Sequence, residues 1–433
     1  MNSEKVDTAL AILEKQLNQP LAAALEVCAR CGICAEACHY YVAEPTPEHI
    51  PAARAEELRK VYRAEHDFLS RIVPAWTGAE RLTEEKLAQF AQIAFDKCTL
   101  CYRCTANCPM GVDTPLLMST LRAMATATGN APEILEMLAD AAIEKGRDPE
   151  IYLEFFKDSI LDMEQELQAL TGDPEARIPL QKKGAKMLYV ALAGAHTILP
   201  AAAIFETAGE DWTLSIYEAA NYGIFLGDAS RAKEIARRIV DEARELGVEE
   251  IVISECGHAY YAMRWLAPNW FGEEFTFRVR SIVEVLADYV QEGRLRLDPS
   301  VNTEPVTYHD SCNLARNGGV IEPPRIVLHA AVANFVEMNP HGKENFCCGG
   351  GGGLVAVPEW FETRMRAGAK KAEQIRAAGA PVVATSCENC NLQLTDLNSY
   401  YKLDVKVVGL MELVVNALLA EKRRQALPLQ EAA

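Results

Sequence analysis

The chain has 433 residues, of which 49% are hydrophobic and 24% charged, and its formal net charge is −18. These fractions are typical of a globular protein with an ample core, and the length predicts about three domains. The acidic balance, without a basic stripe or an arginine-rich arm, argues against a nucleic-acid partner.

The start of the chain predicts the redox compartment. Residues 1–20 form a polar, amphipathic pattern rather than the charged end and apolar core of a secretory signal. We therefore expect a reducing compartment, where clustered cysteines bind metals or act in catalysis. The most apolar run, 187–205, is interrupted by His196, Thr197 and Pro200, so it predicts a buried strand leading into a turn or helix, not a membrane span.

Two cysteine runs with the same spacing follow a helical pattern at residues 5–27 that breaks at Pro20. The cysteines of the two runs are Cys28, Cys31, Cys34 and Cys38, then Cys98, Cys101, Cys104 and Cys108. Two-residue gaps allow three thiolates to converge on one metal cluster from a single turn of backbone. The alternative is a pair of structural zinc sites, although zinc sites usually show two CxxC units each.

This spacing resembles that of bacterial two-cluster ferredoxins, in which the fourth cysteine of each run ligates the other cluster. The resemblance implies two [4Fe–4S] cubane clusters. The implied ligands are Cys28, Cys31, Cys34 and Cys108 for the first cubane, and Cys98, Cys101, Cys104 and Cys38 for the second.

Helical patterns surround both runs. Residues 51–97 are rich in Ala, Glu, Leu, Arg and Lys, with apolar positions at helical intervals, and the pattern resumes at Leu116. We expect a helical ferredoxin domain over residues 1–130 that holds both clusters, followed by a helical connector over 131–186.

From residue 187 onward, short β-prone runs alternate with helical patterns. The predicted strands are 187–193, 250–254, 301–308, 381–385 and 405–408. This alternation indicates an α/β region with mainly parallel strands. The predicted fold class is therefore a multidomain α+β and α/β protein, in which a helical ferredoxin domain precedes a duplicated α/β domain.

The α/β region repeats itself. A helix ended by glycine, then a strand, then a cysteine occurs twice, leading to Cys256 in the first copy and to Cys387 in the second. Two copies of one supersecondary unit are the simplest explanation. We assign the first copy to residues 187–300 and the second, with a C-terminal helix, to 301–433.

A further cysteine group in the second copy surrounds the glycine run 349–353. Its members are Cys312, Cys347, Cys348, Cys387 and Cys390. Adjacent soft thiolates beside bare backbone suggest a metal–sulfur centre. We expect the glycines to leave room for a cluster and for a substrate thiol.

Other interpretations of this group explain less. Cys387 and Cys390 alone could form a thioredoxin-like dithiol, but the other three cysteines would then have no role. A zinc site is complete with four ligands, so five cysteines favour an iron–sulfur assembly. The glycine run lacks both the GK[ST] of a P-loop and the strand and helix context of a dinucleotide site.

The five-cysteine pattern resembles the CCG, or cysteine-rich, domain of the heterodisulfide reductase family. With two ferredoxin runs before it, nearly the whole chain resembles the HdrD-type subunit of that enzyme. The resemblance implies a noncubane [4Fe–4S] cluster at which a dithiol–disulfide substrate is handled. Its implied ligands are Cys312, Cys347, Cys348, Cys387 and Cys390.

The first copy departs from the family pattern, because Asn221-Tyr222-Gly223 takes the place of the cysteine pair. In this respect it is similar to HdrD-like subunits of membrane redox complexes in sulfate-reducing bacteria, of the DsrK, HmcF and TmcB types. Iron–sulfur subunits of glycolate oxidase and lactate utilisation are the next relatives, and they tend to keep both copies. The departure implies one special cluster rather than two.

Cys256 is the one cysteine without a cluster assignment. It is either a buried thiol that packs as a small hydrophobe or a thiol that faces the special cluster, with His258 as a proton donor.

We therefore expect an iron–sulfur electron-transfer subunit of a membrane-associated redox complex involved in sulfate respiration. The first hypothesis is an oxidoreductase acting on sulfur groups, which handles a small-molecule or small-protein disulfide. The second is a non-catalytic relay for a flavin dehydrogenase of the glycolate, lactate or glycerol-3-phosphate type, which passes electrons to quinone. The implied partners are a cytochrome b-like membrane subunit and other subunits of the complex. The implied location is cytoplasmic, on the inner face of the cell membrane.

Overall fold

The computed structural model describes residues 3–144, 149–192 and 195–426. The chain divides into two compact units, each assembled from segments that are distant in sequence. Unit 1 comprises Met1–Asp140, Tyr222–Ala232 and Phe346–Glu373; unit 2 comprises Ala141–Asn221, Lys233–Asn345 and Gln374–Ala433. The predicted domains are contiguous, whereas unit 1 takes one segment from each copy of the α/β repeat.

Unit 1 is built from helices, as expected for a helical ferredoxin domain. The predicted break at Pro20 separates α1 from α2, because Asn18 caps α2 and Pro20 lies in its first turn. The main helices are α1 (Glu4–Gln16), α2 (Gln19–Glu26), α5 (Pro51–His66), α8 (Glu84–Ala91), α10 (Thr114–Ala127) and α11 (Glu133–Glu144). The shorter ones are α3 (Ile33–Ala37), α4 (His39–Ala43), α6 (Phe68–Ile72), α7 (Pro74–Thr77), α9 (Arg103–Ala106), α14 (Gly223–Leu226) and α20 (Phe361–Ala367).

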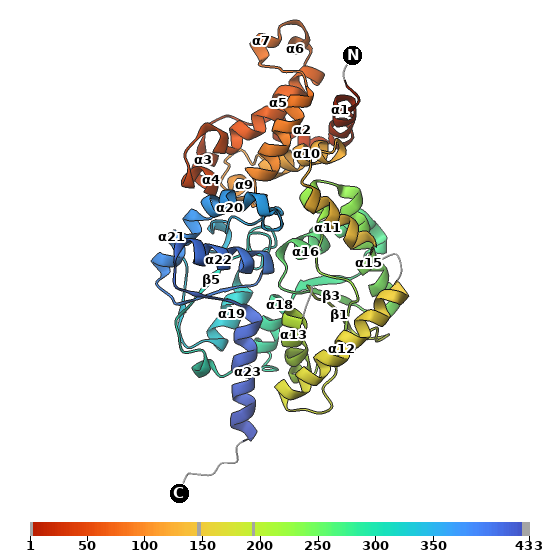
Figure 1. Ribbon diagram of the computed structural model, residues 1–433, viewed down its shortest axis with the longest axis vertical. Helices are drawn as coiled ribbons and strands as arrows, with labels where there is room; N and C mark the ends of the chain where they lie inside the picture. The colour runs from red at the N-terminus through yellow and green to blue at the C-terminus, as the bar shows by residue number, and fades with distance from the viewer. Residues whose placement is uncertain (1–2, 145–148, 193–194, 427–433) are drawn as a thin grey trace. The chain divides into compact units, whose positions relative to one another are not determined.

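Helix α10 is the centre of this unit and contacts α1, α2, α5 and α8 (Figure 1). Its Leu117 and Leu121 are fully buried and pack in one cluster with Leu13, Leu58 and Phe90 from the surrounding helices. Burial of each such side chain contributes roughly 1.5–3 kcal/mol to folding. The helical core thereby holds both cysteine runs, which lie in the loops between these helices.

Unit 2 contains two four-stranded parallel sheets with the same strand order, β2-β1-β3-β4 and β6-β5-β7-β8. The strands are β1 (Met187–Val190), β2 (Trp212–Leu214), β3 (Glu250–Ile253), β4 (Arg278–Ser281), β5 (Val306–His309), β6 (Phe335–Val336), β7 (Val382–Thr385) and β8 (Lys406–Gly409). Pairing is in equivalent register, with Met187 opposite Glu250 in the first sheet and Val306 opposite Val382 in the second. The predicted duplication is therefore confirmed.

Central and edge strands differ in how readily they are predicted. The central strands β1, β3, β5 and β7 are buried along their whole length, so their sequences are continuous apolar runs. The edge strands β2, β4 and β6 were not predicted, because β4 carries two arginines and β6 has only two residues. The predicted strand 187–193 ends earlier, at Val190, and residue 193 lies outside the described part of the chain.

Helices cover both sheets. They are α12 (Pro149–Thr171), α13 (Ala195–Ala208), α15 (Ala229–Leu246), α16 (Gly257–Tyr261), α17 (Ala267–Phe271), α18 (Ile282–Gln291), α19 (Glu322–Ala331), α21 (Ala369–Ala378), α22 (Glu388–Tyr401) and α23 (Leu410–Ala426). The two copies of the repeat contact each other through α18 with α19 and through α13 with α23. Both sheets therefore share one core, which runs from Met187 in β1 to Leu418 in α23.

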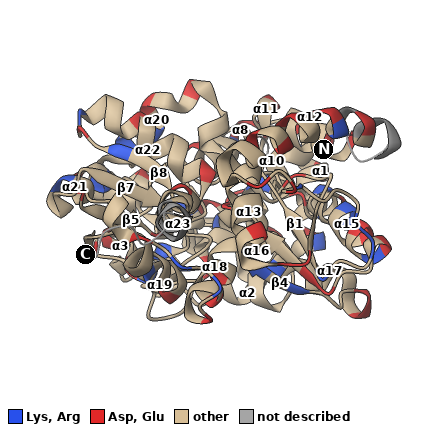
Figure 2. Ribbon diagram, turned by 90° about the horizontal axis from the view of Figure 1, so that it is seen from below, with Lys and Arg blue, Asp and Glu red and all other residues tan. Residues whose placement is uncertain are grey.

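Charges are mixed on the helices. Figure 2 shows acidic and basic positions side by side along α15, as its sequence of alternating Arg, Lys, Glu and Asp requires. Among the described residues, no helix combines the length and the apolar character that are needed to cross a bilayer.

Candidate metal centres

The first cysteine group lies in unit 1 around one small pocket. Its lining includes Cys28, Cys31, Cys34, Cys104 and Cys108. Burial raises the pKa of Cys34, and the neighbouring thiols of Cys28, Cys108 and Cys31 raise it further. Cys108 of the second run thus lies among the cysteines of the first. Cys31 is exposed, so this group reaches the surface.

The second cysteine group is more enclosed, with Cys38, Cys98 and Cys101 buried. Cys104 is only partly buried as a residue, but burial of its thiol raises its pKa well above the usual value. The neighbouring thiols of Cys101, Cys38 and Cys98 raise it further. Cys38 of the first run therefore lies among the cysteines of the second. Thiols that each raise the pKa of the next are poor neighbours unless a metal neutralises them.

A buried arginine gives an independent sign that an anionic group fits the second cysteine group. Arg54 of α5 is 3% exposed, and its Nη2 donates to Cys38 Sγ at 3.3 Å. Its Nε and Nη1 are buried and have no hydrogen-bond partner among the described residues. A guanidinium with unpaired, buried N–H groups requires an acceptor. Because a four-iron cluster brings sulfide and thiolate acceptors, the chemistry of this donor set fits it.

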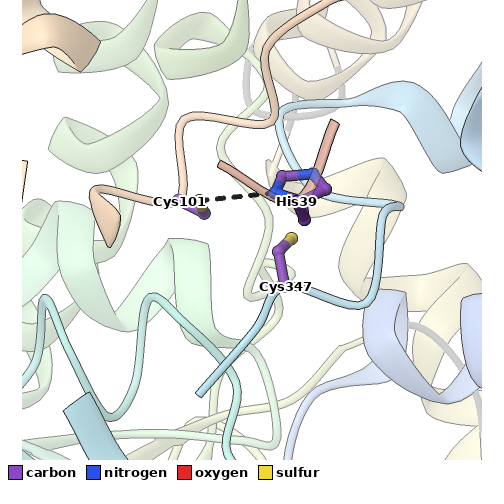
Figure 3. A group of neighbouring side chains, drawn as sticks. All are labelled: His39, Cys101 and Cys347. Carbon is purple, nitrogen blue, oxygen red and sulfur yellow. Dashed lines mark hydrogen bonds between the residues drawn. The ribbon is translucent and has the colours of Figure 1, made fainter. Parts of the chain in front are cut away.

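His39 connects the second group to the cysteine pair of the glycine-rich loop. The histidine follows Cys38, at the position that Pro109 takes after Cys108 in the second run. It is buried, and its Nδ1 lies 4.0 Å from Cys101 Sγ. One donor atom each of His39, Cys101 and Cys347 lie within 4.8 Å of one another (Figure 3). Cys347 also hydrogen-bonds to Cys101, which raises the pKa of Cys101 together with burial.

The glycine run does not leave room for a substrate thiol where it packs against unit 1, so that expectation is wrong at those positions. A Cβ on Gly349, whose φ is +100°, would lie 2.8 Å from Arg364 O and from Gly368 N. A Cβ on Gly352, whose φ is +65°, would lie 2.8 Å from Arg122 Nη2 and 3.1 Å from Thr99 C. These glycines permit close backbone approach and left-handed backbone, so they hold Cys347 and Cys348 against the second run.

Replacing Gly352 with alanine is expected to lower the free energy of unfolding by about 2–4 kcal/mol, because the new Cβ meets both left-handed strain and a clash. Gly129→Ala is the matched control, since Gly129 has a φ of +70° but no atom within 4 Å of an added Cβ. The control should lose only the strain, about 1 kcal/mol. Urea unfolding compares the two; equal losses would mean that the close packing at Gly352 does not matter.

Unit 2 brings together the other cysteines of the five-cysteine set. Cys387 is the N-cap of α22, directly after β7. Hydrogen bonds from Cys390, from Gly257 N–H and from Ser311, the neighbour of Cys312, lower the pKa of Cys387 to about 6, although burial opposes them. Cys387 is thus a thiolate at neutral pH, which is the form that binds metals.

Cys256 occupies the equivalent position in the first copy, as the N-cap of α16 after β3. Burial raises its pKa well above the usual value, and nearby Cys387 raises it further. His258 Nδ1 lies 3.3 Å from Cys256 Sγ, while His258 Nε2 accepts a hydrogen bond from Asn221 N–H at 3.2 Å. Burial lowers the pKa of His258 to about 4, so the ring is neutral at pH 7. The role of this pair toward a cluster stays a prediction.

Glu255 is a buried carboxyl that was not expected to matter. Its Oε1 accepts hydrogen bonds from the N–H groups of Leu410 and Met411, which open α23, and its carbonyl accepts from Glu388 N–H. It therefore connects the first copy to two helices of the second. Burial raises the pKa of Glu255 to about 8, against the lowering effect of the two N–H groups.

The raised pKa of Glu255 gives a signed prediction for stability. The folded protein holds this proton more tightly than the unfolded chain, so the stabilising effect of low pH is lost as pH rises through 8. Between pH 7 and 9 the free energy of unfolding should fall by about 1 kcal/mol from this residue alone. Glu255→Gln should remove that part of the slope in urea unfolding, while the exposed Glu249→Gln should retain it. A slope that Glu255→Gln leaves unchanged would contradict this assignment.

The structure divides the five-cysteine set, with Cys347 and Cys348 in unit 1 and Cys312, Cys387 and Cys390 in unit 2. Their union in one site stays a prediction. The sequence analysis did not identify Arg54, His39 or Glu255. A signal existed for His39, because it replaces the proline of the second run, whereas Arg54 lies in a helix rich in charged residues and gave none.

The comparisons with known proteins agree with these groups. Residues 24–112 match the family described as a 4Fe-4S dicluster domain, and residues 306–395 match the CCG family, described as a cysteine-rich domain. Over 91% of its length, the chain is 30% identical to the Hdr-like menaquinol oxidoreductase iron-sulfur subunit 2 of Archaeoglobus fulgidus, of which it covers 80%.

Two further relatives extend the range of similarity. The chain is 26% identical to a polypeptide of the dihydromethanophenazine:CoB–CoM heterodisulfide reductase of Methanosarcina mazei, with 91% of this chain and 94% of that protein covered. It is 24% identical to the EtfAB:quinone oxidoreductase of Syntrophomonas wolfei, with 86% of this chain and 55% of that protein covered.

Proposed function

The chain belongs to the HdrD-like family of iron–sulfur subunits, and from this we propose that it carries electrons in a membrane-associated redox complex and interconverts a dithiol and a disulfide. The observation that carries the proposal is the contact between Cys101 and Cys347 in unit 1. It joins a cysteine of the second ferredoxin run to a cysteine of the CCG motif, as electron transfer between two clusters requires.

The proposed ligand sets follow the groups of thiols. Cys108 lines the pocket of the first run, and Cys38 lies beside the thiols of the second, which supports an exchange of the fourth ligand. The proposed ligands are Cys28, Cys31, Cys34 and Cys108 for one cubane; Cys98, Cys101, Cys104 and Cys38 for the other; and Cys312, Cys347, Cys348, Cys387 and Cys390 for a noncubane cluster.

Exposure supports an order along this route. Cys31 of the first group is exposed, whereas Cys38, Cys98 and Cys101 of the second are buried. We assign exchange of electrons with partner subunits to the first group, and the second group passes them on beside Cys347. The proposed partners are a cytochrome b-like membrane subunit and other subunits of the complex, and the proposed location is the inner face of the cell membrane.

The proposed reaction breaks one S–S bond, adds one electron to each sulfur and completes two thiols with two protons. When bound, iron–sulfur clusters supply the electrons one at a time. The chain's residues hold the sulfur chemistry in place: Cys387 stays deprotonated near pH 7 because Gly257 N–H, Ser311 and Cys390 donate to it. In this arrangement Cys387 binds metal without competing for the protons of the product thiols.

A non-catalytic relay is the second candidate. Its support is the similarity to the EtfAB:quinone oxidoreductase and the first copy, which lacks the cysteine pair. In that case the chain passes electrons from a flavin dehydrogenase toward quinone and binds no disulfide. Both candidates use the two cubanes, so they differ only at the five-cysteine set.

Iron and sulfide analysis of the anaerobically purified chain tests the proposed clusters. Three four-iron clusters require about twelve iron atoms per chain. A value near eight would remove the noncubane cluster and leave the relay with two cubanes. Zinc in place of iron would overturn both candidates.

A further inference from the structure

Two arginines of α5 are equally buried but use their guanidinium groups differently. Arg54 and Arg59 are each 3% exposed. Arg59 donates to Leu25 O at 2.9 Å and to Ala24 O at 3.0 Å, so its N–H groups are paired with backbone carbonyls. Arg54 instead makes one hydrogen bond, to Cys38 Sγ, and leaves Nε and Nη1 without partners among the described residues.

The surroundings of Arg54 are the thiols of the second cysteine group. Burial alone would lower the pKa of Arg54, but Cys38, Cys98 and Cys104 raise it above its usual value. In return, Arg54 lowers the pKa of Cys98 against the effect of burial. The ring of Tyr40 lies on another side of the guanidinium, 5.8 Å from its carbon. The charge of Arg54 therefore faces sulfur and an aromatic ring.

Resting on the proposed function, we propose that Arg54 is the fixed counter-charge of the second cubane and raises its reduction potential. A four-iron cluster held by four thiolates is negatively charged, and reduction adds one more negative charge. Burial opposes that addition, because low dielectric disfavours charge. A guanidinium in contact with a ligand sulfur favours it, because the attraction grows with the charge of the cluster. Arg54 acts through the ligands and is therefore a positioning residue, not a catalytic one.

This assignment also explains why a buried guanidinium is tolerated in α5. An uncompensated buried cation destabilises a protein by several kcal/mol. The cluster supplies the compensating charge, and its sulfides accept from the N–H groups that no described protein atom satisfies. Cluster and arginine stabilise each other only if the charge is retained, which separates this role from simple packing.

The test is an EPR-monitored redox titration of the full chain, purified anaerobically with its clusters, for Arg54→Gln, Arg54→Lys and Arg59→Gln. We expect Arg54→Gln to keep its iron and to shift one of the two cubane potentials to a more negative value, leaving the other unchanged. Arg54→Lys should restore most of the shift, because it keeps the charge. Arg59→Gln, the matched buried control, should leave the potential of the second cubane where it is.

The other outcomes are also decisive. Unchanged potentials in iron-replete Arg54→Gln would overturn the proposal, as would an equal shift in Arg54→Lys. If Arg54→Gln loses about four iron atoms and Arg54→Lys keeps them, the charge holds the cluster and the proposal stands. If both lose them equally, Arg54 serves shape alone and the proposal fails. Wild-type protein without cubane signals would instead overturn the proposed function, so the two failures are distinguishable.

Discussion

Cys387→Ser is expected to lower the iron content from about twelve to about eight atoms per chain, the loss of one four-iron cluster. Cys387 is the thiol with the lowest pKa in its group, about 6, and serine replaces a soft thiolate with a hydroxyl that stays protonated. Disulfide-dependent turnover should disappear with the cluster. The EPR signals of the two cubanes should remain, which distinguishes loss of one site from unfolding.

The matched control for this variant is Cys256→Ser. Cys256 occupies the same position in the first copy, as the N-cap of the helix after the third strand of its sheet. Outside the ligand sets, it should keep all twelve iron atoms or so. Full iron in Cys387→Ser would contradict the proposed cluster. Loss of four iron atoms in Cys256→Ser would instead add Cys256 to the ligands.

Arg122→Met is expected to lower the free energy of unfolding by about 3–5 kcal/mol, the largest stability effect we predict. Arg122 is fully buried in α10, and burial lowers its pKa to about 10, so it stays charged at pH 7. It donates to Ala94 O at 2.9 Å and, at 2.7 Å each, to Cys98 O, Phe225 O and Gly352 O. Methionine would fill similar space and leave four buried carbonyls without a donor.

Arg122 explains why unit 1 combines three distant stretches of sequence. One guanidinium binds the second cysteine run, the end of α14 and the glycine-rich loop. Urea unfolding measures the effect, and Arg30→Met is the control, since Arg30 is an exposed partner of Glu56. The control should change the free energy by less than about 1 kcal/mol. A similar, small loss in Arg122→Met would show that this junction does not depend on the arginine.

The sequence predicted those parts of the fold that depend on local pattern. The buried strands β1, β3, β5 and β7 are continuous apolar runs, and the cysteine runs indicate their metal chemistry by spacing alone. The edge strand β4 was missed because Arg278 and Arg280 hide its half-buried pattern. Its place in the sheet depends on pairing with β3, which local sequence does not encode.

Long-range contacts explain what the sequence missed at the site. The glycines next to Cys347 and Cys348 look like open space in sequence, but Gly352 is required by Arg122 and Thr99, far away in the chain. Arg54 resembles any arginine of a charged helix until its contact with Cys38 is known. By contrast, the equivalence of Cys256 and Cys387 was predicted, because each follows an apolar strand of the repeat.

The most direct test of the central claim is EPR of the oxidised wild-type protein with and without dithiothreitol or glutathione. If the five-cysteine set holds a cluster that handles thiols, a paramagnetic signal should appear only with added thiol and be absent from Cys387→Ser. A spectrum that stays silent with thiol, with cubane signals only on reduction, would contradict dithiol–disulfide chemistry and leave the chain as an electron relay.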